Sequence, residues 1–175
     1  MAAGTKTTSR LEERFRLWDN DGSGAIERSD FENEADGIIE GLGVQGTPQA
    51  QQLKQAYLAM FDHLAGAVGA SRLNQEQFVR AAEQEIISRG DAGFAQVVRP
   101  TIQAIVNVLD RDDDGEVDSS EMAKWFSAIG LDGHVADEAF RQMDTDGTGR
   151  LSVSELVDAV RDYHLGKNDI PLLGR

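Results

Sequence analysis

The chain has 175 residues, 40% of them apolar, which is enough to form a folded core and argues against disorder. Its 31 acidic and 17 basic residues give a net charge of −14, which disfavours nucleic acid and anionic lipid as partners, because both require a cationic face. The absence of cysteine excludes disulfides, thiolate zinc sites and cysteine nucleophiles, and neither a signal peptide nor an apolar run of membrane-spanning length is indicated. We therefore expect a soluble, cytoplasmic protein.

Apolar residues recur at helical spacing from the N-terminus onward. A capping-box pattern at Ser9 and Glu12 predicts the start of the first helix, which continues to Asp19. The second predicted helix begins at Phe31, and the glycines at 41 and 43 are typical of a helix end.

A cap followed by proline, at Thr47 and Pro48, predicts the start of the third helix. The fourth begins near Asn74 and ends near Gly90, and Pro100 starts or kinks the fifth. The remaining predicted helices cover residues 119–129, 135–143 and 152–163. Because no strand of more than a few residues is indicated, the sequence predicts an all-α fold.

Three 12-residue stretches align without gaps. They are DNDGSGAIERSD from Asp19, DRDDDGEVDSSE from Asp110 and DTDGTGRLSVSE from Asp144. Each has carboxylates at its first and third positions, glycine at the sixth, an aliphatic residue at the eighth and an acid at the twelfth. A single stretch of this kind can be an ordinary acidic surface turn, but three copies in one register, each between predicted helices, argue against that alternative.

Such a loop can surround a hard divalent cation such as calcium, which takes about six to eight oxygen ligands. Side-chain oxygens at positions 1, 3 and 5, the backbone carbonyl at position 7 and a carboxylate at position 12 supply them, and glycine at position 6 permits the sharp turn. In this order, the predicted ligands are Asp19, Asp21, Ser23, Ala25 and Asp30; Asp110, Asp112, Asp114, Glu116 and Glu121; and Asp144, Asp146, Thr148, Arg150 and Glu155.

The ends of the second and third of these loops are also helix starts. Asp118 with Glu121 and Ser152 with Glu155 form capping boxes, at positions 9 and 12 of their loops. A loop that ends by starting a helix has helix–loop–helix geometry.

A fourth loop is expected between the first and the second of these, because such units normally come in pairs. Residues 66–77, GAVGASRLNQEQ, align there but place Val68, Ala70 and Gln77 at ligand positions, so this loop cannot form an oxygen cage. We predict a structural role for it. A short antiparallel bridge would pair Leu73 with Ile26, as Val117 pairs with Leu151.

These units are those of the EF-hand superfamily, which the sequence resembles. The segment RLWDNDGSGAIERSDFENEA, the degenerate second loop and the two complete loops at 110 and 144 carry a closer resemblance, over nearly the whole chain, to the sarcoplasmic calcium-binding proteins and their bacterial, calerythrin-type counterparts. The resemblance implies intracellular calcium binding by one compact body. Two EF-hand pairs, residues 1–90 and 91–165, would pack together, followed by a tail at 166–175.

The ligand count and the resemblance predict a Ca²⁺ buffer or transporter that binds about three Ca²⁺. Asp30 is one methylene shorter than the usual closing glutamate, which favours six-fold coordination, so Mg²⁺ is a second candidate ion for the first loop. We expect a monomer, and the sequence does not indicate any protein target.

A Ca²⁺ sensor that regulates a target protein is the alternative. Sensors expose a methionine-rich groove when calcium binds, whereas only three methionines here are internal and no long polar linker separates two lobes. The C-terminal NDIPLLGR carries Ile170, Leu172 and Leu173, which would either form a frayed end or dock into the groove that a sensor would offer to its target. Both observations favour the buffer.

We predict no enzymatic activity. The histidines, His63, His134 and His164, are scattered and belong to no motif with a nucleophile or a metal triad. Trp18 and Trp125 lie in apolar stripes at helical spacing, so we expect them to pack in the core rather than to recognise a ligand.

Overall fold

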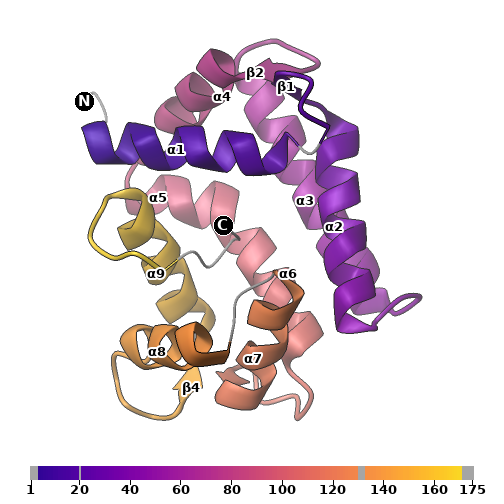
Figure 1. Cartoon of the computed structure of the whole chain (residues 1–175), viewed down its shortest axis with the longest axis vertical. Helices are drawn as coiled ribbons and strands as arrows, with labels where there is room; N and C mark the ends of the chain where they lie inside the picture. Colours follow the sequence, from indigo (N-terminus) through magenta and orange to yellow (C-terminus); the bar gives the residue numbers. More distant parts are fainter. Residues whose placement is uncertain (1–3, 20, 130–132, 171–175) are drawn as a thin grey trace.

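The computed structural model describes residues 4–19, 21–129 and 133–170. Within these ranges the chain is mostly helical, which confirms the predicted all-α class, and its strands are two residues long (Figure 1). The α-helices are α1 (Thr5–Trp18), α2 (Arg28–Leu42), α3 (Pro48–Ala67), α4 (Gln75–Ala82), α5 (Asp91–Gly93), α6 (Arg99–Leu109), α7 (Ser119–Ala128), α8 (Gly133–Met143) and α9 (Val153–His164). Two π-helical turns, η1 (Glu83–Ile87) and η2 (Phe94–Val98), continue α4 and precede α6.

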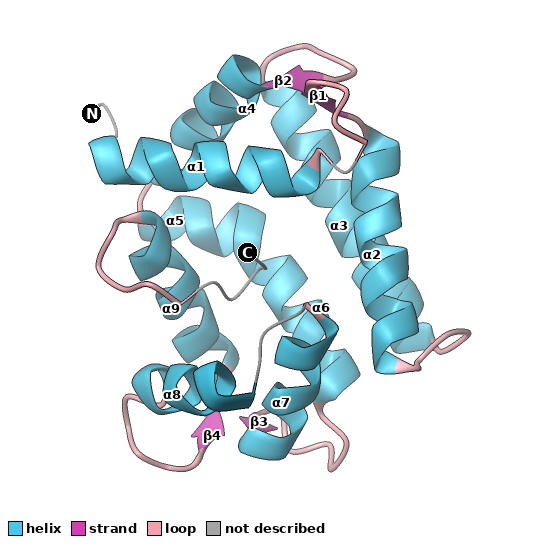
Figure 2. Cartoon of the chain, viewed as in Figure 1, coloured by secondary structure: helices cyan, strands magenta, loops and turns pink. Residues whose placement is uncertain are grey.

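Two short antiparallel bridges join the loops in pairs. Strand β1 (Ala25–Ile26) pairs with β2 (Leu73–Asn74), and β3 (Val117–Asp118) pairs with β4 (Arg150–Leu151). Ile26 lies opposite Leu73, and Val117 lies opposite Leu151, so the register predicted from the sequence is confirmed. Figure 2 shows these two sheets at opposite ends of the molecule.

The first helix begins earlier than predicted. It starts at Thr5, so Ser9 lies inside α1 and the predicted capping box at Ser9 is wrong. Tertiary packing accounts for the extra turn. Thr7 is buried, and the guanidinium carbon of Arg10 lies 4.1 Å from the ring centroid of Tyr163 in α9.

Of the two glycines predicted to end the second helix, one ends it and the other is a packing position. Gly43 adopts the left-handed conformation, with φ 69°, directly after α2. Gly41 lies inside the helix, where α2 passes so close to α7 that a Cβ on it would be 3.4 Å from the Cβ of Ala128.

The fourth predicted helix, which comprises α4 and η1, meets α5 at a tight corner. Gly90 has a φ of 60° and ends the fourth helix where the sequence predicts. A Cβ on Gly93 would lie 2.3 Å from the carbonyl oxygen of Ile86, so the corner requires glycine there. Pro100 lies in the first turn of α6, directly after η2.

Nearly all buried apolar side chains of the described residues form one cluster that includes members of both loop pairs. Trp18 lies 4.5 Å from Phe31 and 5.9 Å from Phe78, measured between ring centroids, and Trp125 is fully buried, so both tryptophans are core residues as predicted. The compact body is therefore confirmed. Because both pairs share this core, the boundary between residues 90 and 91 stays a prediction.

None of the helices in the described ranges has the length and apolar character that crossing a membrane requires.

Candidate metal centres

Each of the three acidic loops brings three carboxylates together. In every group, one oxygen from each of the three residues lies within 4.8 Å of the others. The groups are Asp19, Asp21 and Asp30; Asp110, Asp112 and Glu121; and Asp144, Asp146 and Glu155. These are positions 1, 3 and 12, and position 12, at the other end of the loop, meets the first two because the chain closes on itself.

The first loop closes through hydrogen bonds to Asp19, which directly follows α1. Its two carboxylate oxygens accept bonds from the amides of Ser23 at 3.0 Å and Gly24 at 2.9 Å. The Ser23 hydroxyl donates to the carbonyl of Ala25 at 3.0 Å, which links positions 5 and 7. Gly24 has a φ of 87°, as expected for the sharp turn at position 6.

The loop at Asp144 repeats this pattern with threonine in place of serine. Asp144 accepts bonds from the amides of Thr148 at 3.2 Å and Gly149 at 2.8 Å. The Thr148 hydroxyl donates to the carbonyl of Arg150 at 3.0 Å. A hydroxyl at position 5 therefore produces the same arrangement in both loops.

The loop at Asp110 differs at its fourth position. Asp113 has a φ of 59°, whereas Gly22, Gly69 and Gly147 hold the equivalent left-handed position in the other loops. Aspartate tolerates this conformation better than most residues, although less well than glycine.

The same loop also differs at its fifth position. The carboxylate of Asp114 lies outside the group formed by Asp110, Asp112 and Glu121, and its Oδ2 contacts Nη1 of Arg150, from the neighbouring loop. Asp114 is therefore paired with a cationic side chain of the neighbouring loop, which also lies 3.8 Å from Asp112 Oδ2.

The closing acids also start the exiting helices. Glu121 Oε1 accepts a bond from the Asp118 amide, and Glu155 Oε1 accepts one from the Ser152 amide, both at 3.0 Å. In return, the Asp118 side chain accepts a bond from the Glu121 amide, and the Ser152 side chain accepts one from the Glu155 amide. Both predicted capping boxes are therefore confirmed. In the first loop, Asp30 Oδ2 accepts a bond of 2.8 Å from the amide of Glu27, so the shorter acid serves the same function.

Burial and neighbouring carboxylates raise the pKa of two acids in these loops, Asp30 and Asp112. Burial raises the pKa of Asp30, and the carboxylates of Asp21 and Asp19 raise it further, although the bond from the Glu27 amide lowers it. Burial and a hydrogen bond with Asp110 raise the pKa of Asp112. A cation among these oxygens would relieve both effects. Since every predicted donor is an oxygen, the donor set fits a hard divalent cation.

The degenerate loop keeps its shape without ligands. Gly69 is left-handed, as in the other loops, and Gln77 takes the place of the closing acid. The Gln77 side chain accepts a bond of 2.9 Å from the amide of Asn74, and Oδ1 of Asn74 accepts one from the amide of Gln77 at 2.8 Å. The helix start and the bridge to β1 are therefore both preserved.

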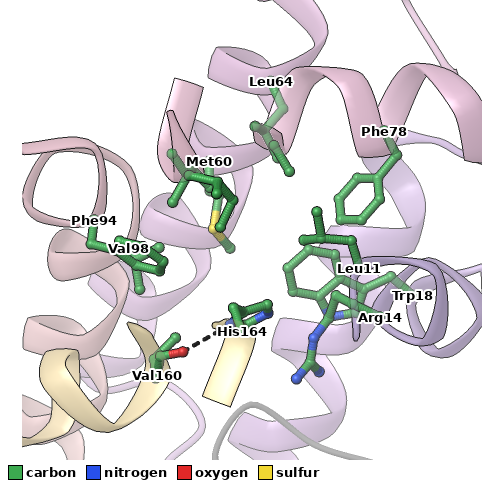
Figure 3. A pocket seen from close by; sticks show the side chains of 13 residues that line it. Leu11, Arg14, Trp18, Met60, Leu64, Phe78, Phe94, Val98, Val160 and His164 are labelled. Atoms are coloured by element: carbon green, nitrogen blue, oxygen red, sulfur yellow. Dashed lines mark hydrogen bonds between the residues drawn. The ribbon is translucent and has the colours of Figure 1, made fainter. Parts of the chain in front are cut away.

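Two buried polar side chains, Arg14 and His164, were not anticipated. They line a cavity of about 30 Å³ among apolar residues of α1, α3, α4 and α9 (Figure 3). Arg14 follows Leu11 by three residues and precedes Trp18 by four, so its place in the apolar stripe was visible in the sequence.

His164 is a packing residue and is 7% exposed. Its Nδ1 bonds the carbonyl of Val160 at 2.9 Å, which makes Nδ1 the protonated nitrogen. Burial lowers the pKa of His164 to about 4, and the charges of Arg14 and Arg10 contribute. The imidazole is therefore neutral at neutral pH.

Paired helix–loop–helix units with these loops define the EF-hand class of proteins. The family model described as EF hand matches residues 102–127, and the one described as EF hand domain matches residues 135–163. Calerythrin from Saccharopolyspora erythraea is 43% identical over 171 residues, which covers 95% of this chain and 97% of that protein. The chain therefore belongs to the calerythrin family of EF-hand proteins.

Solved structures of two further proteins share the fold. A Streptomyces coelicolor calcium-binding protein, described in connection with prokaryotic calcium-mediated regulation, is 31% identical, with a TM-score of 0.75 over 91% of this chain and 98% of that chain. The photoprotein berovin from Beroe abyssicola, in its Ca²⁺-loaded apoprotein state, is 29% identical, with a TM-score of 0.70 over 89% of this chain and 86% of that chain.

Proposed function

We propose that this chain is a calcium-binding protein that takes three Ca²⁺, in the loops 19–30, 110–121 and 144–155. The observation that carries the proposal is the presence of three carboxylate groups, each drawn from positions 1, 3 and 12 of its loop. The side chains at position 5 and the carbonyls of Ala25, Glu116 and Arg150 would complete each oxygen set. Membership of the calerythrin family supports the same ion.

Calorimetric titration of the metal-free chain with Ca²⁺ tests this proposal. We expect a stoichiometry of three, and Glu121→Gln and Glu155→Gln should each remove about one site, because each removes a closing carboxylate. Glu76→Gln is the matched control, since Glu76 is the acid of the degenerate loop and stands at position 11, which supplies no ligand. Loss of a site in this control, or a stoichiometry unchanged in both loop variants, would contradict the assignment.

We further propose that the first loop accepts Mg²⁺ more readily than the other two. Asp30 is shorter than glutamate and reaches an ion less easily with both oxygens, which favours the octahedral geometry of Mg²⁺. Asp30→Glu should therefore weaken magnesium competition at this loop. The reverse exchange, Glu155→Asp, should introduce such competition at the last loop. Equal competition before and after both exchanges would refute the argument.

Buffering is the role that we propose for calcium binding, in a monomeric cytoplasmic protein without catalytic activity. The support comes from the C-terminal segment that follows α9. Ile170 is 6% exposed and belongs to the core cluster. Asn168 Nδ2 donates to the carbonyl of Ala159 at 3.1 Å, and Asp169 forms an ion pair with Arg10 of α1. This segment covers apolar surface that a sensor would offer to a target; Leu172 and Leu173 lie outside the described residues.

A calcium sensor is the second candidate, because the Streptomyces coelicolor relative is described in connection with calcium-mediated regulation. The two roles differ in what calcium does to apolar surface. Addition of Ca²⁺ to a buffer should leave the binding of a hydrophobic dye low, whereas a sensor should gain dye binding.

A further inference from the structure

Arg150 belongs to one loop and reaches into the other. It stands at position 7 of the loop at Asp144, where the predicted ligand is its backbone carbonyl. Strand pairing places it opposite Asp118, beside the loop at Asp110. There its Nη1 contacts Oδ2 of Asp114 and lies 3.8 Å from Oδ2 of Asp112.

The two carboxylates that it meets are predicted ligands at positions 5 and 3. Asp114, the closer one, lies outside the carboxylate group of its loop. The loop at Asp110 has seven acids in twelve residues, against three in the loop at Asp144, so the cation faces the more negative loop of the pair. The side chain of Arg150 is 46% exposed, which leaves its charge partly screened by water.

We propose that Arg150 is a built-in counter-charge that lowers the calcium affinity of the loop at Asp110; this inference rests on the proposed function. In the metal-free chain the guanidinium offsets repulsion among the acids, and a bound Ca²⁺ must share Asp112 and Asp114 with it. A guanidinium that shares a carboxylate with a divalent ion lies about 5 Å from it, the sum of a metal–oxygen distance and a hydrogen bond. A single charge at that distance in a water-like dielectric, screened by salt, changes affinity roughly 3- to 10-fold.

A second arginine occupies the same position in the other loop pair. Arg72 stands at position 7 of the degenerate loop, and its Nη2 lies 3.5 Å from Oε1 of Glu27 in the first loop. Glu27 is at position 9 and is not a predicted direct ligand. Arg72 therefore provides a matched control with the same charge and the same loop position in the other loop pair.

The test uses the full chain and the amides of the position-6 glycines. The amide of Gly115 donates to Asp110 at 2.8 Å, and that of Gly24 donates to Asp19 at 2.9 Å, so their NMR signals report each loop separately. Calcium is set with chelator buffers. Arg150→Gln removes the charge, Arg150→Lys retains it, and both leave the backbone carbonyl in place.

We expect Arg150→Gln to shift the Gly115 midpoint to roughly 3- to 10-fold lower calcium, and Arg150→Lys to stay within about twofold of the unaltered chain. Arg72→Gln should leave the Gly115 midpoint unchanged. A Gly115 signal that responds to calcium with the same or a higher midpoint in Arg150→Gln overturns this inference and leaves the proposed function intact. A Gly115 signal that never responds to calcium in the unaltered chain overturns the proposed site and the inference together.

Discussion

Replacement of Ile170 by alanine should both destabilise the protein and open its apolar surface. Ile170 is 6% exposed, and comparable truncations of buried aliphatic side chains cost about 2–5 kcal/mol. We expect the lower end, about 2 kcal/mol, because the residue lies in a terminal segment that can relax around the gap. The ion pair between Asp169 and Arg10 adds little, since the Asp169 side chain is 81% exposed.

The assay combines urea unfolding with binding of a hydrophobic dye, both on the calcium-loaded chain. Ile170→Ala should lower the free energy of unfolding and raise dye binding. Leu165→Ala is the matched control: Leu165 precedes the same segment but is 37% exposed, so its truncation should cost less than about 0.5 kcal/mol. Strong calcium-induced dye binding by the unaltered chain, unaffected by Ile170→Ala, would refute the docked segment and the buffer role together.

Removal of calcium by a chelator should lower the melting temperature strongly. Calcium at a hundredfold excess over the Kd of a site adds about 2.7 kcal/mol to the free energy of unfolding, and three such sites add about 8 kcal/mol. A melting temperature unchanged within a few degrees would contradict this. The pKa of His164 is about 4 in the folded chain, below its unfolded value of 6.5. As the pH falls, the unfolded chain therefore binds a proton at this imidazole before the folded chain does. Stability that is present above pH 6.5 is lost as the pH falls to 4. Metal-free protein should therefore lose about 2 kcal/mol more than the His164→Gln variant between pH 7 and pH 5 in urea unfolding, and equal losses would exclude a buried neutral imidazole. Asp113→Gly should raise the metal-free melting temperature by a few degrees, because glycine adopts the observed φ of 59° without strain, whereas Asp113→Ala should lower it; the opposite order would argue against a left-handed residue at this position.

The sequence by itself determined the features that depend on local spacing. Twelve residues suffice to define a loop, so the carboxylates of Asp19, Asp21 and Asp30 could be assigned to one group before their positions were known. The capping boxes and the register of Ile26 with Leu73 follow for the same reason, because a loop that starts a helix at position 9 leaves position 8 to form the bridge. Alignment of the repeats also located the degenerate loop.

Tertiary structure decided the features that depend on contacts between distant segments. The start of α1, the packing role of Gly41 and the burial of His164 all result from neighbours far along the chain, which no local pattern specifies. The side chain of Arg150 is the clearest case: its position in the loop assigned it a carbonyl ligand, but antiparallel pairing of β3 with β4 carries its guanidinium to Asp114. Ligand spacing is a property of the backbone within one loop, whereas the charge around an ion is summed over every chain segment that folding brings within a Debye length.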